Sequence, residues 1–578
     1  MLEFQPIWYL LILKKIVLKN KFFLPILLLI LILPAFYFFL KPGIYWNMHD
    51  DMQVIRQLSL EKCLNDGQIP CRWVPDLGYG YGYPLFNYYP PLPYFIGEIF
   101  RVFKFSFVDT VKLVAATQII LAAFFMYLLG KSLTNRMGGL LSAVFYTYAP
   151  YHAVNIYVRG AMNEAWASTF FPLVLYFIRQ LILKPKPVHL IGLSLSFSAI
   201  LLSHNPMALI FTPICFAWFV FWLLKSNNLK NLTIYKYFSL SAILSISLSA
   251  FFILPLLFET KLVQIDSLFS DYYSYSVHFA TFFQLFLSNF WGDGPSVWGP
   301  YDEMSFSIGY LHWIIPLIVL FFSIKKYLKT KKSSFLVAPF LVILGFFFAF
   351  MVHQRSTPIW ILISPIQNVQ FPWRFLNPTI FLMSLSVAFF PQFFKNRLVS
   401  IFLILLVILI SYKHFYPIHS GPITDQQKFS GESWRLLTSG SIYDYLPKTS
   451  PTAPKQPAKP YIDAIVPEST KYQLSGQKKG TDWMFFNINL SQPASLYLSN
   501  LAFPNFKVTD NGTPINYSIE PVLGRISLDN LATGNHQIYL KLDNTPIRTF
   551  SNTVSLVSLC ILAAYFIYQL WKKSNYKV

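Results

Sequence analysis

Residues 22–40 read FFLPILLLILILPAFYFFL, a run that contains no charged side chain. An α-helix needs about 20 apolar residues to cross the roughly 30 Å of hydrocarbon in a bilayer, so this run is long enough to span one. Three more runs of this kind lie at 335–352, 398–412 and 553–570. Residues 36–42 offer no convincing small-residue cleavage site, which favours a retained anchor over a signal peptide. Together the runs predict an integral membrane protein.

The composition agrees with a chain that lies largely in lipid. Of its 578 residues, 54% are hydrophobic and 12% are charged, whereas soluble proteins carry about 25% charged residues. The net charge of +21 would suit nucleic acid, but the basic residues fall in short loops between apolar runs and form no single patch. Such loops set membrane orientation, so we exclude a nucleic-acid partner and expect the lipid bilayer as the environment.

Charge also predicts the side that each loop faces. Lysines before the first run place the N-terminus in the cytoplasm: Lys14, Lys15, Lys19 and Lys21. We expect about twelve spans, at 22–40, 110–130, 137–151, 165–182, 188–203, 206–224, 237–257, 306–324, 334–352, 378–394, 398–415 and 551–571. The loops that should then be cytoplasmic are all basic: 131–136, 184–186, 225–236, 325–332, 395–397 and the tail from Lys572. The chain is thus predicted to cross the plasma membrane many times, with both termini in the cytoplasm.

The same topology places four longer pieces outside the cell, at 41–109, 258–305, 353–377 and 416–550. In the last piece a Pro-rich linker at 450–461 precedes short alternating runs, which turn signals such as Asp510-Asn-Gly512 separate. This pattern predicts a small extracytoplasmic β-sandwich. The expected fold class is mainly α, a polytopic membrane protein with that β-sandwich before the last helix. The expected domains are a membrane domain, a linker with a β-rich domain, and a C-terminal transmembrane helix with a basic tail: 1–415, 416–550 and 551–578.

Cysteine positions leave one question open. Cys63 and Cys71 share the first outer loop, so they can form a disulfide in an oxidising compartment or remain two free thiols. Cys215 and Cys560 fall inside predicted spans and are expected to be inert packing residues.

Polar residues gather at the predicted outer ends of the spans. They include Asp50, Asp51, Arg159, Glu164, His204, Asp293 and Arg374. A transporter needs a site near the bilayer midplane, whereas a one-sided cluster suits an enzyme that works at the outer surface. Asp50 stands out because apolar residues with helical spacing follow it, so it lies near the start of a surface helix whose dipole favours a carboxylate. Each of the other residues taken singly is an ordinary solvated loop residue.

Residues 78–94 read GYGYGYPLFNYYPPLPY, which predicts an irregular aromatic loop. Tyr83 and Tyr88 lie in it and are candidates for contact with substrate. Rings with polar tips suit sugar stacking or lipid headgroups, and an aromatic belt at the membrane interface explains them equally well.

Several of these strings resemble a known family. Met48-His-Asp-Asp-Met52, Val158-Arg-Gly-Ala-Met-Asn-Glu-Ala165, Leu202-Ser-His-Asn-Pro206 and Gln370-Phe-Pro-Trp-Arg-Phe375 resemble bacterial and archaeal membrane proteins labelled 6-pyruvoyl-tetrahydropterin synthase-related, with the layout of the GT-C superfamily of glycosyltransferases. Tyr443-Asp-Tyr-Leu-Pro447 resembles the outer domain of YfhO-like membrane proteins. Nothing resembles the zinc-binding histidines of the soluble pterin enzyme.

The resemblance implies a reaction and roles for named residues. The donor would be a sugar on a polyprenyl phosphate, the acceptor an envelope glycan or lipid, and the anomeric centre would invert. Asp50 would act as general base, with Asp51 as the alternative. Arg159 or Arg374 would neutralise the leaving phosphate, and Glu164 and His204 would orient Arg159 or the acceptor. Some superfamily members use a divalent metal; no ligand set in the sequence decides this, and no other cofactor is implied.

Two other functions fit the same fold. A flippase or transporter of lipid-linked glycans would need essential polar residues at mid-span and would tolerate Asp50→Asn. A non-catalytic envelope assembly protein would also tolerate that change but would depend on the β-domain. Fold alone does not separate the three functions.

Overall fold

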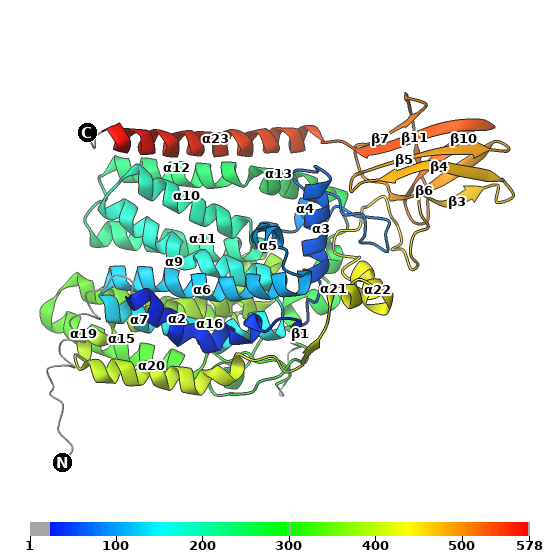
Figure 1. Ribbon diagram of the computed structural model, residues 1–578. Helices are drawn as coiled ribbons and strands as arrows, with labels where there is room; N and C mark the ends of the chain where they lie inside the picture. Colours follow the sequence, from blue (N-terminus) through cyan, green and yellow to red (C-terminus); the bar gives the residue numbers. More distant parts are fainter. Residues whose placement is uncertain (1–22, 298, 300–301, 576–578) are drawn as a thin grey trace, which may run out of the picture.

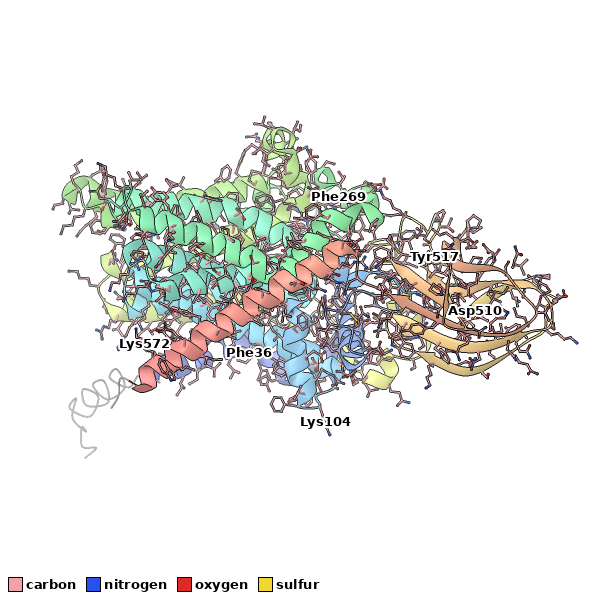
Figure 2. All side chains as sticks on the ribbon, turned by 90° about the horizontal axis from the view of Figure 1, so that it is seen from above. Phe36, Lys104, Phe269, Asp510, Tyr517 and Lys572 are labelled. Atoms are coloured by element: carbon pink, nitrogen blue, oxygen red, sulfur yellow. A yellow bond between two sulfur atoms is a disulfide. The ribbon has the colours of Figure 1, made fainter. Side chains whose placement is uncertain are left out.

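Long apolar helices run side by side, and two β-sheets lie next to one end of this helix bundle, which we call the sheet-bearing end (Figure 1). The computed structural model describes residues 23–297, 299 and 302–575. The lysines at 14–21, which predict a cytoplasmic N-terminus, lie outside the described residues. Figure 2 shows the last helix, α23 (Pro546–Asn575), running from the sheets to the opposite end, with Asp510 and Lys572 far apart.

Among the described residues, eight helical segments are long and apolar enough to cross a membrane. They are α6 (Phe107–Leu133), α9 (Met162–Leu183), α11 (Asn205–Lys225), α15 (Tyr310–Thr330), η7 with α16 (Ser333–Met351), the segment Pro372–Phe393, α20 with η12 (Arg397–His414), and α23. The segment Pro372–Phe393 comprises η10 (Pro372–Phe375), α18 (Leu376–Ser386), η11 (Val387–Phe389) and α19 (Phe390–Phe393). A ninth span results if α12 (Leu232–Leu248) and α13 (Ala250–Glu259), bent by 76° at their junction, are counted as one.

The mainly helical membrane fold is confirmed, but the expected count of about twelve spans is not. Within the described residues, three expected spans form shorter helices than the eight above: α2 (Phe23–Phe36) with η1 (Tyr37–Leu40), α7 (Arg136–Thr147) and α10 (Pro187–Leu201). In α7 the reason is Pro150, because the residue before a proline is disfavoured in helical backbone. Ala149 is extended (φ −63°, ψ 126°), and α8 (Pro150–Ala153) and the π-helical turn η2 (Val154–Val158) follow.

The sheet-bearing end of the bundle is built from the first loop. Strand β1 (Ile44–Trp46) pairs antiparallel with β2 (Ser420–Pro422). The expected surface helix after Asp50 is α3 (Gln53–Asn65). Cys63 and Cys71 form a disulfide that closes the turn after it. The expected irregular loop contains one helical turn, α4 (Leu85–Tyr88), and leads into α5 (Leu92–Val102).

Short elements complete this end. They are η3 (Thr260–Leu262), η4 (Asp266–Leu268), η5 (Asp271–Tyr273), η6 (Tyr275–Val277), α14 (Phe282–Phe286), η8 (Gln354–Ser356), α17 (Thr357–Leu362), η9 (Ser364–Val369), α21 (Asp425–Lys428) and α22 (Gly431–Ser439).

The predicted β-sheet region before the last helix is present. One sheet has the order β3 (Ile462–Val466), β6 (Ala494–Leu501), β10 (Arg525–Leu531), β9 (Ser518–Ile519), and the other β4 (Tyr472–Lys479), β5 (Trp483–Leu490), β11 (Gly534–Leu542), β7 (Phe506–Asp510), β8 (Thr513–Ile515). All pairings are antiparallel. Alternate residues of β5 are buried, and Phe486 shares a core with Leu496 and Leu528 of the other sheet. The two sheets therefore pack face to face, as apolar faces of alternating strands require.

Hydrogen bonds tie the sheets to the first loop. The carboxylate of Asp66, at the end of α3, accepts from the backbone N–H of Thr481 (2.7 Å), the hydroxyl of Thr481 (2.8 Å) and the indole N–H of Trp483 (3.1 Å). The ring of Trp73 packs edge-on against Phe506 of β7, with 5.2 Å between centroids. The first loop is thus held between the helices and the sheets.

Candidate functional site

A cavity of about 670 Å³ opens at the sheet-bearing end of the bundle. Its walls come from segments far apart in the sequence: the first loop, the starts of α9 and α11, the stretches 268–304 and 370–374, and a turn at 441–445. Its charged, histidine and aromatic lining residues include Asp50, Arg56, Tyr88, Tyr89, Arg159, Glu164, His204, Tyr273, Phe371, Trp373, Arg374, Asp444 and Tyr445.

Asp50 lies just before α3, and its position is fixed by backbone and side-chain contacts. Its backbone N–H donates to the carbonyl of Arg159 (3.0 Å). Its Oδ2 accepts from Arg56 Nη1 (2.7 Å) and from Gln53 Nε2 (3.0 Å). The carboxylate is one-third exposed, and its Oδ1 has no hydrogen-bond partner in the described part of the chain. One oxygen of Asp50 is therefore anchored, and the other is available to a ligand.

Arg56 links Asp50 to the aromatic wall. Its guanidinium lies 4.2 Å from the ring centroid of Tyr89, and its Nη1 also donates to the hydroxyl of Tyr89 (2.9 Å). Because Arg56 is itself 4% exposed, its direction is set by packing, and so is the direction of the Asp50 carboxylate that it holds.

Glu164 lies in the first turn of α9, only 1% exposed, and holds two arginines. Its Oε1 lies 2.9 Å from Arg159 Nη1, and its Oε2 accepts from Arg374 Nε (3.2 Å). Asn377 Nδ2 and the hydroxyl of Tyr151 also donate to Oε1, at 2.6 and 3.2 Å. A buried charge is tolerated when it is paired and hydrogen-bonded in this way.

The two arginines stack on an aromatic pair. The guanidinium of Arg159 lies 4.0 Å from the ring of Trp373, and that of Arg374 lies 4.9 Å from the ring of Phe371. The two rings are themselves stacked, with centroids 4.5 Å apart. Two guanidinium groups against one carboxylate leave one net positive charge, and planar guanidinium donors bind phosphate well. This side of the cavity is suited to an anion.

His204 begins α11 as its N-cap, and its Nδ1 accepts from the backbone N–H of Met207 (3.2 Å). Burial, assisted by the charge of Arg374, lowers the pKa of His204 to about 3. The ring is therefore neutral at pH 7. Because Nδ1 accepts, the proton lies on Nε2, which can donate to a ligand.

The structure gathers most, but not all, of the residues that the sequence singled out. Asp50, Arg159, Glu164, His204, Asp293, Arg374 and Tyr88 line the cavity. Asp51 lies outside it, and its Oδ2 pairs with Lys428 Nζ of α21 at 2.5 Å. Tyr83 also lies outside it, fully buried in an apolar cluster and paired through its backbone with Val74. Tyr88 donates its hydroxyl to the carbonyl of Glu259 (2.8 Å).

Asp444 is the acidic residue that sequence reasoning missed. It lies in the turn after α22, lines the same cavity as Asp50, and interacts electrostatically with Arg56. Burial raises the pKa of Asp444 to about 6, although the charge of Arg56 opposes the shift. The sequence offered one signal, an aspartate between two aromatic residues at 443–445.

In the described ranges, no group of three or more His, Cys, Asp or Glu side chains is arranged to hold a metal ion.

A family model described as the 6-pyruvoyl-tetrahydropterin synthase related domain, a membrane protein, matches residues 86–418. The chain belongs to this family. The match covers the starts of α9 and α11 and the Pro372–Phe393 segment, so it includes the arginine side of the cavity. The expected resemblance to this family is confirmed.

An uncharacterized protein of Lactococcus lactis subsp. cremoris (strain MG1363) is 26% identical over 294 residues, which are 49% of this chain and 46% of that protein. The chain thus matches less than half of the length of this relative. Among solved structures, the mycobacterial arabinofuranosyltransferase AftD aligns with 70% of this chain and 28% of its own, with 13% identity and a TM-score of 0.42. The Archaeoglobus fulgidus oligosaccharyltransferase AglB, in complex with an inhibitory peptide and a dolichol-phosphate, aligns with 72% and 57%, with 12% identity and a TM-score of 0.38. TM-scores this low assign neither fold nor activity.

Proposed function

We propose that this protein is a GT-C-type membrane glycosyltransferase that moves a sugar from a polyprenyl-phosphate carrier to a hydroxyl group of a cell-envelope glycan or lipid. One observation carries the proposal. A single cavity holds a carboxylate with an available oxygen, Asp50, beside two arginines that leave a net positive charge, Arg159 and Arg374. Transfer from a phosphate leaving group needs a proton acceptor and an anion site at one centre.

In the proposed reaction, Oδ1 of Asp50 takes the proton of the acceptor hydroxyl while the acceptor oxygen attacks the anomeric carbon. The bond between that carbon and the phosphate oxygen breaks, and the lipid phosphate leaves with the electron pair. Arg159 and Arg374 stabilise the negative charge that develops on the phosphate. Attack opposite the leaving group in one step inverts the anomeric centre.

The depth of the arginines suits a lipid-borne phosphate. Glu164 lies in the first turn of α9, and Arg374 lies at the start of the apolar segment Pro372–Phe393. The ends of membrane helices lie at the headgroup level, where the phosphate of a lipid carrier is found. We infer that this end faces outward, because the short basic loops join the helices at their other ends.

The direct test is sugar transfer in membranes that contain the full-length protein, from radiolabelled polyprenyl-phosphate sugars to envelope fractions. Asp50→Asn keeps the shape of the side chain but removes the base, and we expect transfer to fall about 100-fold or more. The matched control is Asp266→Asn, an exposed carboxylate at the start of η4, with expected wild-type activity.

Equal transfer by wild type and Asp50→Asn would exclude Asp50 as the base. Absence of transfer by the wild type with every donor would contradict the proposal and favour the flippase or assembly function. A flippase would instead show carrier movement that survives Asp50→Asn.

A further inference from the structure

The turn that carries Asp444 is clamped against the first loop and the stretch after α13. The backbone N–H of Gln264 donates to the carbonyl of Leu446 (2.8 Å), and that of Lys448 donates to Leu262 (2.9 Å). Beside Asp444, the ring of Tyr445 stacks on that of Tyr88, with centroids 5.5 Å apart. Backbone on one side and stacked rings on the other thus hold this turn as a wall of the cavity.

The cavity is electrically polarised along its length. On the side of Asp50, the carboxylates of Asp50 and Asp444 lie near one guanidinium, Arg56, which leaves a net negative charge. A third lining aspartate, Asp293, contacts the ring of His49 through its backbone carbonyl and adds to that charge. On the other side, Arg159 and Arg374 lie against Glu164, which leaves one net positive charge. A donor phosphate is attracted to the arginine side, and an anionic group is repelled from the side of Asp50.

We propose that Asp444 binds the acceptor: its carboxylate accepts hydrogen bonds from hydroxyl groups of an uncharged glycan and holds the reacting hydroxyl toward Asp50. This assignment rests on the proposed function and deepens it by naming the acceptor class, a neutral hydroxylated glycan rather than a phosphate-bearing polyol. The partly exposed rings of Tyr445 and Tyr89 give this side of the cavity aromatic faces on which sugar rings pack, and the buried ring of Tyr88 supports that of Tyr445 from behind.

Acceptor binding should then depend on pH. The titratable and charged groups that interact with Asp444 from neighbouring elements are Asp50, Arg56, Tyr83, Tyr89, Tyr273 and Tyr445. Burial raises the pKa of Asp444 to about 6, so its carboxylate is ionised above that pH and gains a proton as the pH falls through it. A protonated carboxyl loses acceptor capacity, and affinity for the glycan should fall below about pH 6.

The kinetic test uses the transfer assay with increasing amounts of a neutral envelope glycan fraction as acceptor. For Asp444→Asn we expect the acceptor KM to rise about tenfold, which corresponds to about 1.4 kcal/mol, while kcat changes much less. The acidic limb of kcat/KM near pH 6 should vanish in this variant and persist in Asp266→Asn. A loss in kcat with an unchanged acceptor KM, or no change in either, would overturn the assignment.

A second measurement uses the unmodified full-length protein and needs no activity. Dicyclohexylcarbodiimide reacts with protonated, shielded carboxyl groups, and peptide mass spectrometry locates the adduct. We expect Asp444 to be modified more at pH 5.5 than at pH 8, and the neutral glycan fraction to protect it. Protection without any sugar transfer would contradict the proposed function and support acceptor binding. Transfer without protection would retain the proposed function and overturn the role of Asp444.

Discussion

Gly160 brings the acid and the arginine of the site together. Val158 and Arg159 accept backbone hydrogen bonds from His49 and Asp50, both at 3.0 Å, and Gln53 donates to the carbonyl of Gly160 (2.8 Å). Gly160 has φ +62°, and a Cβ there would overlap the side chain of Met48. The segments 48–50 and 158–160 can therefore approach each other closely because Gly160 has no side chain.

We expect Gly160→Ala to reduce sugar transfer by an order of magnitude or more and to destabilise the protein by about 1–3 kcal/mol, from backbone strain and overpacking. Thermal unfolding in detergent and the transfer assay measure the two effects. Gly43→Ala is the control. Gly43 has φ +66°, but no atom lies within 4 Å of the place that a Cβ would take. This variant therefore measures the backbone strain without a steric clash. Equal losses in both variants would contradict a special role for the contact with Met48.

Arg374 is expected to act through its planar group. Its Nε binds Glu164, and its Nη1 donates to the carbonyl of Val369 and to Gln370 Oε1, both at 2.7 Å. Lysine keeps the charge but cannot make this set of contacts. We expect Arg374→Lys to raise the donor KM about tenfold or more, measured with increasing polyprenyl-phosphate sugar. Arg355→Lys, at an exposed arginine, should leave it unchanged; an unchanged donor KM in Arg374→Lys would remove Arg374 from the phosphate site.

At this scale, most of the residues that sequence reasoning singled out, from residue type and expected position at span ends, line one cavity. Sequence reasoning preferred Asp50 but kept Asp51 as the alternative, because the directions of adjacent side chains in an irregular segment depend on their neighbours, here Arg56 and Lys428. It missed Asp444 because its partners in the cavity are hundreds of residues earlier in the chain.

At the scale of elements, α6 depends on a cap from a distant helix. The carboxylate of Asp425 in α21 accepts from the backbone N–H groups of Phe107 (2.8 Å) and Val108 (3.0 Å), at the start of α6. The first N–H groups of a helix have no partners within it, and an anion is favoured there. A segment that follows α20 thus stabilises the start of a membrane span.

Removing this cap should cost stability. We expect Asp425→Ala to lower the free energy of unfolding by about 1–2 kcal/mol, seen as a lower Tm of the detergent-solubilised protein. Gln426→Ala, at the next and exposed position of α21, should leave the Tm unchanged. If both variants have the Tm of the wild type, the contact of Asp425 with the start of α6 contributes nothing measurable to stability.

The hydrophobic runs predicted the positions of the helices better than their lengths. The sequence placed a span at 137–151, and Pro150 ends α7 at Thr147 instead. The alternating runs and turn residues of the β-region were sufficient to predict sheets, because a strand with one buried face has a period of two. Their pairing order, with β11 between β5 and β7, depends on contacts that local sequence does not encode.

At the scale of the whole molecule, a buried ion pair fastens the last helix to the bundle. Arg548 Nε of α23 donates to Glu259 Oε2 of α13 (2.8 Å), and the two side chains are 1% and 5% exposed. Asn87 and Thr545 also donate to Glu259, at 2.9 and 2.6 Å. Because α23 follows the sheets directly in the chain, this ion pair helps to fix the position of the sheets relative to the helix bundle.

Breaking one side of the pair should be more harmful than replacing both. Arg548→Met leaves the buried carboxylate of Glu259 without its ion-pair partner and should destabilise the protein by about 3 kcal/mol. The double variant Glu259→Gln with Arg548→Met should recover part of that loss. Unfolding in detergent measures both, and a double variant that is less stable than Arg548→Met would contradict the explanation.

The pairing of β1 with β2 also bears on how the protein is made. Strand β1 is synthesised early and waits for its partner until the chain has passed residue 420. The wall that carries Asp444 is translated later still. A nascent chain inserted as far as α20 therefore has the helices of the site but an open cavity. Under the proposed function, such a half-made chain lacks the wall that we assign to the acceptor and should not transfer sugar.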